Sequence, residues 1–181
     1  MKLFIMGMPG VGKSTILQNV VAQLKEKGYR VGGIACPEIR EEGNRIGFEI
    51  IDLMSGRRGV LSHVSLPSGP YVGKYHVNLR DLTQVGVVAL DNAVSEADII
   101  VIDEIGPMEL LGRDFQEAAM RVVESPKPVL GIIHWRIKHP IIDGIKSRSD
   151  VKIYEITPQN RGDIQAKIME EVLNTLGKKS S

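Results

Sequence analysis

Residues 7–15 read Gly7-Met8-Pro9-Gly10-Val11-Gly12-Lys13-Ser14-Thr15. This stretch matches the phosphate-binding pattern G-x-x-x-x-G-K-[ST] at every fixed position. Glycines allow backbone conformations that are closed to other residues, so successive N–H groups can point at a phosphate. A helix that begins at Lys13 would add its free N–H groups and the positive end of its dipole. We therefore predict a P-loop that binds a nucleoside triphosphate through these nine residues, with Lys13 on the β- and γ-phosphates and Ser14 on Mg²⁺.

The sequence on both sides of this stretch supports the P-loop interpretation. Residues 3–6 form an apolar run typical of a buried parallel strand. Apolar residues recur at helical spacing from about Lys13 to Lys27, and Gly28 should end that helix. Residues 30–36 then read as a second strand. A strand, a glycine-rich turn and a helix in this order are what a P-loop requires.

The remainder of the chain alternates helices and strands, apart from one β-rich segment. Three short β-like runs (45–53, 59–64 and 71–79) are separated by turn residues, and we interpret residues 45–79 as an antiparallel insertion at one end of the sheet. Further helices are expected at 82–97, 115–124, 140–146 and 162–176, and further strands at 99–103, 129–134 and 151–156. The fold class is therefore α/β, with helices on both faces of a mostly parallel sheet.

Length and composition are those of one globular domain. We expect a single domain over residues 1–176 and a flexible tail over 177–181. The formal net charge of +1 gives no global attraction to nucleic acid or to an anionic membrane. Cys36 is the single cysteine, so no intramolecular disulfide can form, and no apolar run reaches the ~18 residues of a membrane span. We expect a cytoplasmic protein without a nucleic-acid or membrane partner; no motif identifies a protein partner.

Two carboxylates follow the apolar run Ile99–Ile102. A P-loop site needs a carboxylate from a neighbouring strand to hold the waters of Mg²⁺, and Asp103 has the required position. Glu104 would face the γ-phosphate if the chain already turns at the strand end, and it would then act as general base toward water. The alternative is that both acids simply cap a strand or the next helix.

Hydrolysis also calls for positive charge beyond Lys13, because negative charge develops on the γ-phosphoryl oxygens. Arg136 is the preferred candidate, since it follows the strand 129–134 in a segment that could cover the site. Lys74 and Arg45 are outside candidates, and each of the three has the alternative role of a solvated surface charge. Asp103–Gly106 fits the D-x-x-G pattern of GTPases, but no N-K-x-D follows. We therefore expect weak discrimination between bases.

Several segments together resemble a known family. In chain order these are 7–15, Arg45-Ile46-Gly47-Phe48-Glu49-Ile50-Ile51, Val72-Gly73-Lys74-Tyr75, Asp103-Glu104-Ile105-Gly106-Pro107-Met108-Glu109-Leu110, His139-Pro140 and Thr157-Pro158-Gln159-Asn160-Arg161. Across nearly the whole chain they are similar to the small P-loop nucleoside-triphosphatases, which include thermophile NTPases and the cancer-related nucleoside-triphosphatase. Two positions depart from the family pattern: Pro107 replaces the usual Lys, and His76 replaces a common Gly.

The resemblance implies a RecA-like P-loop fold and slow, Mg²⁺-dependent hydrolysis of ATP, GTP, CTP and UTP with little base preference. It also implies that nucleotide is bound by residues 7–15 and by the stretch 99–106, with Ile102, Asp103, Glu104 and Gly106 included. Two other functions stay open at this point. A P-loop kinase would pass the phosphoryl group to a small acceptor held by the insertion 45–79, and a nucleotide-dependent switch would signal by binding a partner.

Overall fold

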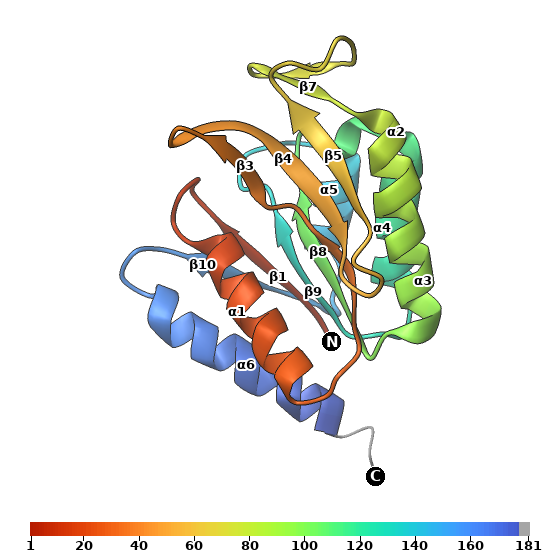
Figure 1. Cartoon of the computed structure of the whole chain (residues 1–181). Helices are drawn as coiled ribbons and strands as arrows, with labels where there is room; N and C mark the ends of the chain where they lie inside the picture. Colours follow the sequence, from red (N-terminus) through yellow and green to blue (C-terminus); the bar gives the residue numbers. More distant parts are fainter. Residues whose placement is uncertain (178–181) are drawn as a thin grey trace.

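One continuous ten-stranded sheet organises the chain (Figure 1). The structure is a computed structural model that describes residues 1–177. Five strands pair in parallel in the spatial order β10-β1-β9-β8-β2. Their bounds are β1 Lys2–Gly7, β2 Val31–Ala35, β8 Ile99–Ile105, β9 Val129–Ile133 and β10 Val151–Ile156. We expected the two carboxylates on a strand next to β1, but β9 lies between β1 and β8.

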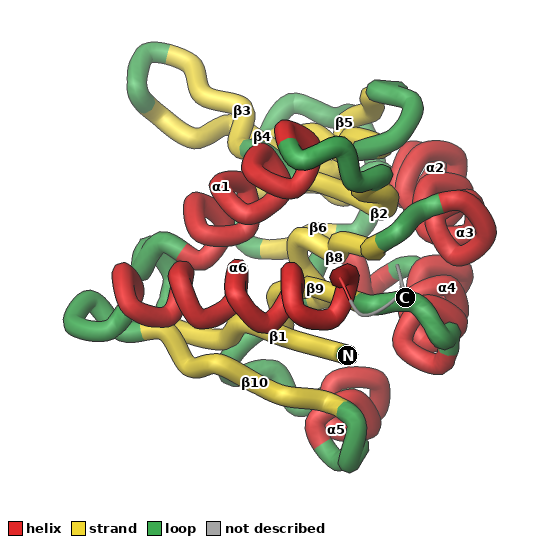
Figure 2. The backbone as a smooth tube through the Cα atoms, turned by 90° about the horizontal axis from the view of Figure 1, so that it is seen from below, coloured by secondary structure: helices red, strands yellow, loops and turns green. Residues whose placement is uncertain are grey.

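Helices cover both faces of the sheet, as predicted (Figures 1 and 2). One face packs against α1 (Lys13–Glu26) and α6 (Arg161–Gly177), and the other against α3 (Val88–Glu96), α4 (Arg113–Glu124) and α5 (Pro140–Lys146). Successive residues of β1 alternate between the two cores: Leu3 and Ile5 belong to one, and Phe4 to the other. Burial on both faces explains why the parallel strands read as continuous apolar runs.

The β-rich insertion extends the sheet with antiparallel strands, as expected, but it begins earlier than predicted. Its strands are β3 (Glu38–Glu41), β4 (Asn44–Asp52), β5 (Arg58–His63), β6 (Tyr71–Val72) and β7 (Tyr75–Val77). β3 was missed because Glu38-Ile39-Arg40-Glu41 is charged and largely exposed, so it lacks the apolar alternation of a half-buried strand. β4 pairs with β2 through Ile34–Asp52 and Ala35–Ile51, which joins the insertion to the parallel half.

Gly33 of β2 contacts both halves of the sheet, the parallel half at β8 and the insertion at the end of β4. Its φ of +99° is unusual for a strand, and a Cβ atom there would lie 2.0 Å from the Val101 carbonyl oxygen on β8. Its own carbonyl accepts a hydrogen bond of 2.9 Å from the Leu53 amide, just beyond β4. Glycine is therefore required for β2 to approach β8 closely while it also holds the end of β4.

The helix expected over residues 82–97 begins three residues earlier and changes pitch along its length. It consists of α2 (Leu79–Asp81), a π-helical segment η1 (Leu82–Val87) and α3. The Asn78 side chain caps it by accepting from the Asp81 amide at 3.1 Å, which ends the preceding β-like run at Val77. Gly86 lets η1 approach β4, since a Cβ atom there would lie 2.7 Å from Ile50 Cδ1.

The C-terminal helix α6 runs one residue further than predicted, because Gly177 belongs to its last turn. The rest of the tail, residues 178–181, lies outside the described residues. Gly28 ends α1 as expected, with φ +84° and a hydrogen bond of 3.0 Å from the Tyr29 amide to the Leu24 carbonyl. Over residues 1–177 no helix combines the length and apolar character that crossing a membrane requires.

Candidate functional site

The loop between β1 and α1 has the backbone of a phosphate-binding turn. Gly10 and Gly12 have φ values of +77° and +105°, conformations that favour glycine, and α1 begins at Lys13 as predicted. Lys13 Nζ donates to the carbonyl oxygens of Gly7 and Met8, both at 2.9 Å. Burial lowers the pKa of Lys13, while Glu104 and Asp103 oppose that shift. The ammonium is thus held over the loop by neutral carbonyls, which a phosphate can replace.

Asp103 meets the start of α1 although its strand is not adjacent to β1. Its side chain is only 3% exposed, and Ser14 Oγ lies 3.4 Å from its Oδ1 atom. The Cys36 amide donates to Oδ2 at 3.2 Å. Burial raises the pKa of Asp103, against the opposing effects of the Cys36 amide, Ser14 and Lys13. A serine hydroxyl and a buried carboxylate therefore converge beside the P-loop.

Glu104 reaches the same region through a β-bulge. We expected the strand to end at Asp103, but β8 continues to Ile105, and Asp103 and Ile105 pair with the consecutive β9 residues Ile132 and Ile133. The extra residue is Glu104, and a bulge redirects the side chain at that position. Burial raises its pKa, Asp103 adds to the increase, and Lys13 opposes it. A carboxylate with a raised pKa is a stronger base.

Two connected hollows adjoin these residues. A cleft of about 480 Å³ runs along the P-loop and is lined there by Pro9, Gly10, Gly12, Lys13, Ser14 and Thr15. An inner cavity of about 150 Å³ adjoins it, and both hollows share the lining residues Ser14, Cys36, Phe48 and Glu104. Other predicted nucleotide-binding residues line neither. Gly7, Val11 and Ile102 are buried, Met8 is 61% exposed, and the Gly106 amide donates to Glu109 Oε2 at 3.2 Å.

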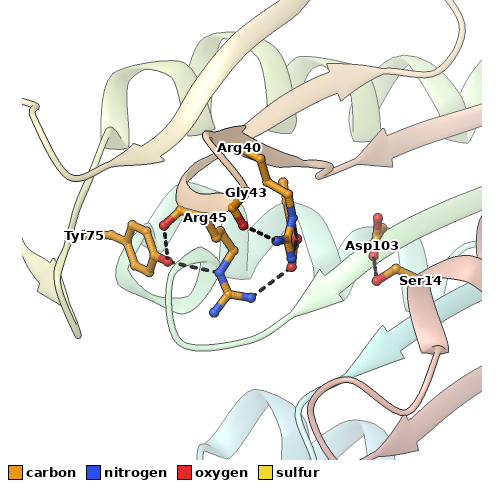
Figure 3. A network of polar contacts seen from close by, with 7 residues as sticks. Ser14, Arg40, Gly43, Arg45, Tyr75 and Asp103 are labelled. Atoms are coloured by element: carbon orange, nitrogen blue, oxygen red, sulfur yellow. Dashed lines mark hydrogen bonds and ion pairs between the residues drawn. The ribbon is translucent and has the colours of Figure 1, made fainter.

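Of the three candidate cations, Arg45 lines the cleft. Its Nε donates to the Tyr75 hydroxyl at 3.0 Å and its Nη1 to Glu38 Oε1 at 2.9 Å. The hydrogen bonds from Tyr75 and Glu38 raise the pKa of Arg45, and its guanidinium lies 5.2 Å from the centre of the Phe48 ring. Figure 3 shows this network together with the Ser14–Asp103 contact. The insertion thus holds one arginine at the rim that faces the P-loop.

Arg136 and Lys74 are not among the residues that line the cleft or the inner cavity. Arg136 is exposed, with its guanidinium 4.1 Å from the centre of the neighbouring Trp135 ring. Lys74 Nζ lies 5.4 Å from the centre of the Tyr75 ring. The segment that follows β9 does approach the site through another residue, His134, which lines the inner cavity.

Comparison with known proteins identifies a family that matches nearly the whole chain. The model of a family described as NTPase matches residues 2–169. The chain belongs to this NTPase family. It is 44% identical over 178 residues to the nucleoside-triphosphatase THEP1 of Methanosarcina acetivorans, covering 98% of this chain and 99% of the relative, and 43% identical over 173 residues to the THEP1 of Thermofilum pendens, covering 95% of each.

Two solved structures of the NTPase family share the fold. THEP1 from Aquifex aeolicus superposes with a TM-score of 0.84 at 32% identity, covering 95% of this chain and 99% of that one. A human cancer-related nucleoside triphosphatase superposes with a TM-score of 0.81 at 35% identity, covering 96% and 97%. These matches confirm the predicted fold class and the family resemblance.

Glu109 and His134 are among the residues that line the inner cavity of this NTPase but that the sequence reasoning did not assign to the site. Glu109 is 5% exposed, and burial, with Glu104 as the next cause, raises its pKa to about 8. His134 Nδ1 accepts from the amides of Arg136 and Ile137 at 3.3 and 3.2 Å, and burial followed by Lys13 lowers its pKa. The signal for Glu109 was present in the sequence: a lone acid inside the apolar run Met108–Leu111.

The donor atoms beside the P-loop suit Mg²⁺. Ser14 and Asp103 offer a hydroxyl and a carboxylate oxygen, which are hard ligands, and Mg²⁺ takes few protein ligands together with phosphate oxygens and waters. Within residues 1–177, no group of three or more His, Cys, Asp or Glu side chains could form a metal site composed of protein ligands alone. The residues present therefore fit a metal that arrives with the nucleotide.

Proposed function

We propose that this NTPase hydrolyses the γ-phosphate of nucleoside triphosphates in a Mg²⁺-dependent reaction, slowly and with little preference for the base. The observation that carries the proposal is the convergence of Lys13, Ser14 and Glu104 in the cleft, with Asp103 in contact with Ser14 from the adjoining cavity. The family match and the printed names of its relatives support the same activity. The substrates would be free ATP, GTP, CTP and UTP in the cytoplasm.

In the proposed reaction a water oxygen attacks the γ-phosphorus while Glu104 accepts a proton from that water. The bond between the γ-phosphorus and the bridging oxygen breaks, and the nucleoside diphosphate leaves with that oxygen. Glu104 suits this role because it lines both hollows and because burial raises its pKa. Lys13 would exchange the carbonyls of Gly7 and Met8 for phosphate oxygens.

Ser14 and Asp103 would hold Mg²⁺. When bound, the metal neutralises charge on the β- and γ-phosphate oxygens. The protein itself holds the Ser14 hydroxyl and the Asp103 carboxylate close together. The Cys36 amide fixes one oxygen of Asp103 and leaves the other 3.4 Å from the Ser14 hydroxyl. The carboxylate is thereby orientated before the nucleotide arrives.

Arg45 is the cation best placed to act on the γ-phosphate as charge develops there. Its Nε and Nη1 are held by Tyr75 and Glu38, and it lines the cleft opposite the P-loop. An arginine supplied within the same chain is a recurring device in phosphoryl transfer. Arg136 stays the alternative, because its segment would have to rearrange to bring the side chain from Trp135 to the cleft.

The test is phosphate release from ATP, GTP, CTP and UTP, each with Mg²⁺ and with EDTA. We expect kcat/KM values within about tenfold of one another and no turnover in EDTA, since the sequence has a complete P-loop but no N-K-x-D. A preference of about a hundredfold for one nucleotide, equivalent to about 2.7 kcal/mol, would contradict the proposed lack of base selection. Turnover that persists in EDTA would contradict the metal requirement.

A further inference from the structure

His134 is held in one orientation by backbone groups on both sides. Its own amide donates to the Ile105 carbonyl at 3.1 Å, which keeps the residue against the end of β8. Its ring nitrogen Nδ1 accepts from the amides of Arg136 and Ile137 at 3.3 and 3.2 Å. The imidazole is therefore positioned by the protein before any nucleotide binds, which is what a preorganised hydrogen-bond donor requires.

The contacts of Nδ1 also determine which ring nitrogen carries the proton. A backbone amide can only donate, so Nδ1 is the acceptor, and in a neutral imidazole the proton then lies on Nε2. Burial, followed by the charge of Lys13, lowers the pKa of His134, which keeps the ring neutral at pH 7. Within residues 1–177 the Nε2 atom makes no hydrogen bond. His134 thus offers one fixed N–H donor that no protein group uses.

The place of this donor relates it to the γ-phosphate. β9 lies between β1, which leads into the P-loop, and β8, which carries Glu104 (Figure 1). His134 directly follows β9 and lines the inner cavity together with Ser14 and Glu104. The proposed hydrolysis requires the γ-phosphate to meet both the Mg²⁺ ligand Ser14 and the base Glu104. The phosphate must therefore enter the space that His134 lines.

The other groups around this cavity show why a donor is needed there. Asp103, Glu104 and Glu109 line it, and its described lining includes neither lysine nor arginine. His134 is the one described lining residue whose side chain carries an N–H group. Negative charge develops on the γ-phosphoryl oxygens as the reaction proceeds, and a donor that is already orientated stabilises it without reorganisation. A neutral imidazole can act on a substrate oxygen in this way.

From these observations we infer that His134 is a catalytic residue of this NTPase, and that its Nε2–H group donates a hydrogen bond to a γ-phosphoryl oxygen in the transition state. The imidazole keeps its proton throughout, because Glu104 accepts the proton of the attacking water. This inference rests on the proposed function, since it concerns the same γ-phosphate. The competing explanation is a structural role, in which His134 only closes the turn to Ile137 through Nδ1.

Asparagine and glutamine substitutions separate these two roles. In His134→Asn the amide oxygen lies the same number of bonds from Cα as Nδ1, so the variant keeps the acceptor for the backbone amides and loses the donor. His134→Gln does the reverse, because its amide nitrogen corresponds to Nε2. We expect His134→Asn to lower kcat at least about tenfold with KM within about threefold, since removing one preorganised donor costs about 10²–10³-fold in kcat. His134→Gln should retain a higher kcat than His134→Asn.

His139→Asn is the matched control for these measurements. Nδ1 of His139 likewise accepts from a backbone amide, that of Ile141 at 3.2 Å, but the residue lines neither hollow. We expect this variant to release phosphate from ATP within about twofold of wild type. A kcat for His134→Asn within threefold of wild type would overturn the donor role alone. Absence of phosphate release from the wild-type protein would instead overturn the hydrolysis on which that role rests.

Nitrogen-15 NMR of the histidine rings tests the same donor in the wild-type protein, so it holds even if a variant fails to fold. We expect the free protein to show an unprotonated Nδ1 and a protonated Nε2 at His134. Mg²⁺, ADP and aluminium fluoride, which mimics the transferred phosphoryl group, should shift the Nε2 signal relative to Mg²⁺ and ADP alone, while the His139 signals stay in place. An Nε2 signal that aluminium fluoride leaves unchanged in the nucleotide-bound protein would overturn the proposal.

Discussion

Ser14 and Asp103 are separated by 89 positions in sequence, yet the Ser14 hydroxyl oxygen lies 3.4 Å from Asp103 Oδ1. The contact spans β9, since Ser14 lies in the first turn of α1, which follows β1, and Asp103 belongs to β8. Asp103 is also bonded to the Cys36 amide at the end of β2. Three parallel strands thus contribute their carboxyl-terminal ends to one point, which is where open α/β sheets bind ligands.

Lys13→Ala is expected to lower turnover at least about tenfold and to weaken triphosphate binding. Lysine supplies the positive charge nearest to the transferred group, and alanine leaves the phosphate oxygens facing only backbone N–H groups. Steady-state phosphate release and equilibrium binding of a non-hydrolysable triphosphate measure the two effects. Lys25→Ala, on the same helix but outside the P-loop cleft, is the control. Turnover above a tenth of wild type would reject the P-loop assignment.

Glu104→Gln is expected to lower kcat at least about a hundredfold while nucleotide affinity stays level or increases. Glutamine keeps the shape of the side chain but cannot accept a proton from water, and positioned general bases contribute about 10²–10⁴-fold. Single-turnover hydrolysis and nucleotide binding are the measurements.

Asp103→Asn is the comparison variant for this prediction. Because it removes a proposed Mg²⁺ partner, its defect should be partly relieved at high Mg²⁺, whereas the Glu104→Gln defect should not be. Hydrolysis by the Glu104→Gln protein within threefold of wild type would eliminate Glu104 as the base.

Arg45→Ala is expected to lower kcat by at least about tenfold with little change in KM, the pattern of an interaction made in the transition state. Tyr75→Phe removes one of the groups that hold the guanidinium, so it should show a smaller loss of the same kind. Arg136→Ala is the competing variant and should stay near wild type. The reverse result, a loss with Arg136→Ala and none with Arg45→Ala, would assign the role to the segment after β9.

Glu109→Gln tests the raised pKa of a buried acid. The folded protein keeps the Glu109 proton up to about pH 8, whereas the unfolded chain releases it near the ordinary value of 4.5. The free energy of unfolding therefore falls as pH rises through this window, by up to about 1.4 kcal/mol per pH unit from this group. Glutamine stays neutral, so the variant should gain stability relative to wild type between pH 5 and pH 8.

Urea unfolding at several pH values measures this difference, with exposed Glu26→Gln as the control. A difference between Glu109→Gln and wild type that does not change with pH would contradict the burial argument. Asp103 and Glu104, whose pKa values are also raised, are present in both proteins, so their effects largely cancel in the comparison.

The elements predictable from sequence are those whose local pattern and tertiary environment agree. The P-loop, the beginning of α1 at Lys13 and the glycine stop at Gly28 follow from backbone requirements that the sequence states directly. The parallel strands follow from burial on both faces. β3 could not be predicted, because a charged edge strand has no apolar period and forms only where β4 offers it a partner.

Several residues of the site could likewise be predicted from the sequence, but their geometry could not. The pattern identified Asp103 and Glu104 as acids near a strand end, but only the pairing with β9 reveals the bulge that directs Glu104. Arg45 could be named as a candidate but not preferred, because its position depends on Tyr75, thirty residues away. Long-range contacts of this kind leave no trace in local periodicity.

The pairing of β4 with β2 bears on how the molecule melts. Ile50 and Leu61 of the insertion belong to the same core as Phe4 and Ile102 of the parallel half, so neither part can lose its packing without exposing the other to water. Heating should consequently produce a single calorimetric peak, with equal calorimetric and van't Hoff enthalpies. The walls of the nucleotide cleft would then disappear together, and partial denaturation would leave no population that retains the P-loop without its opposite rim.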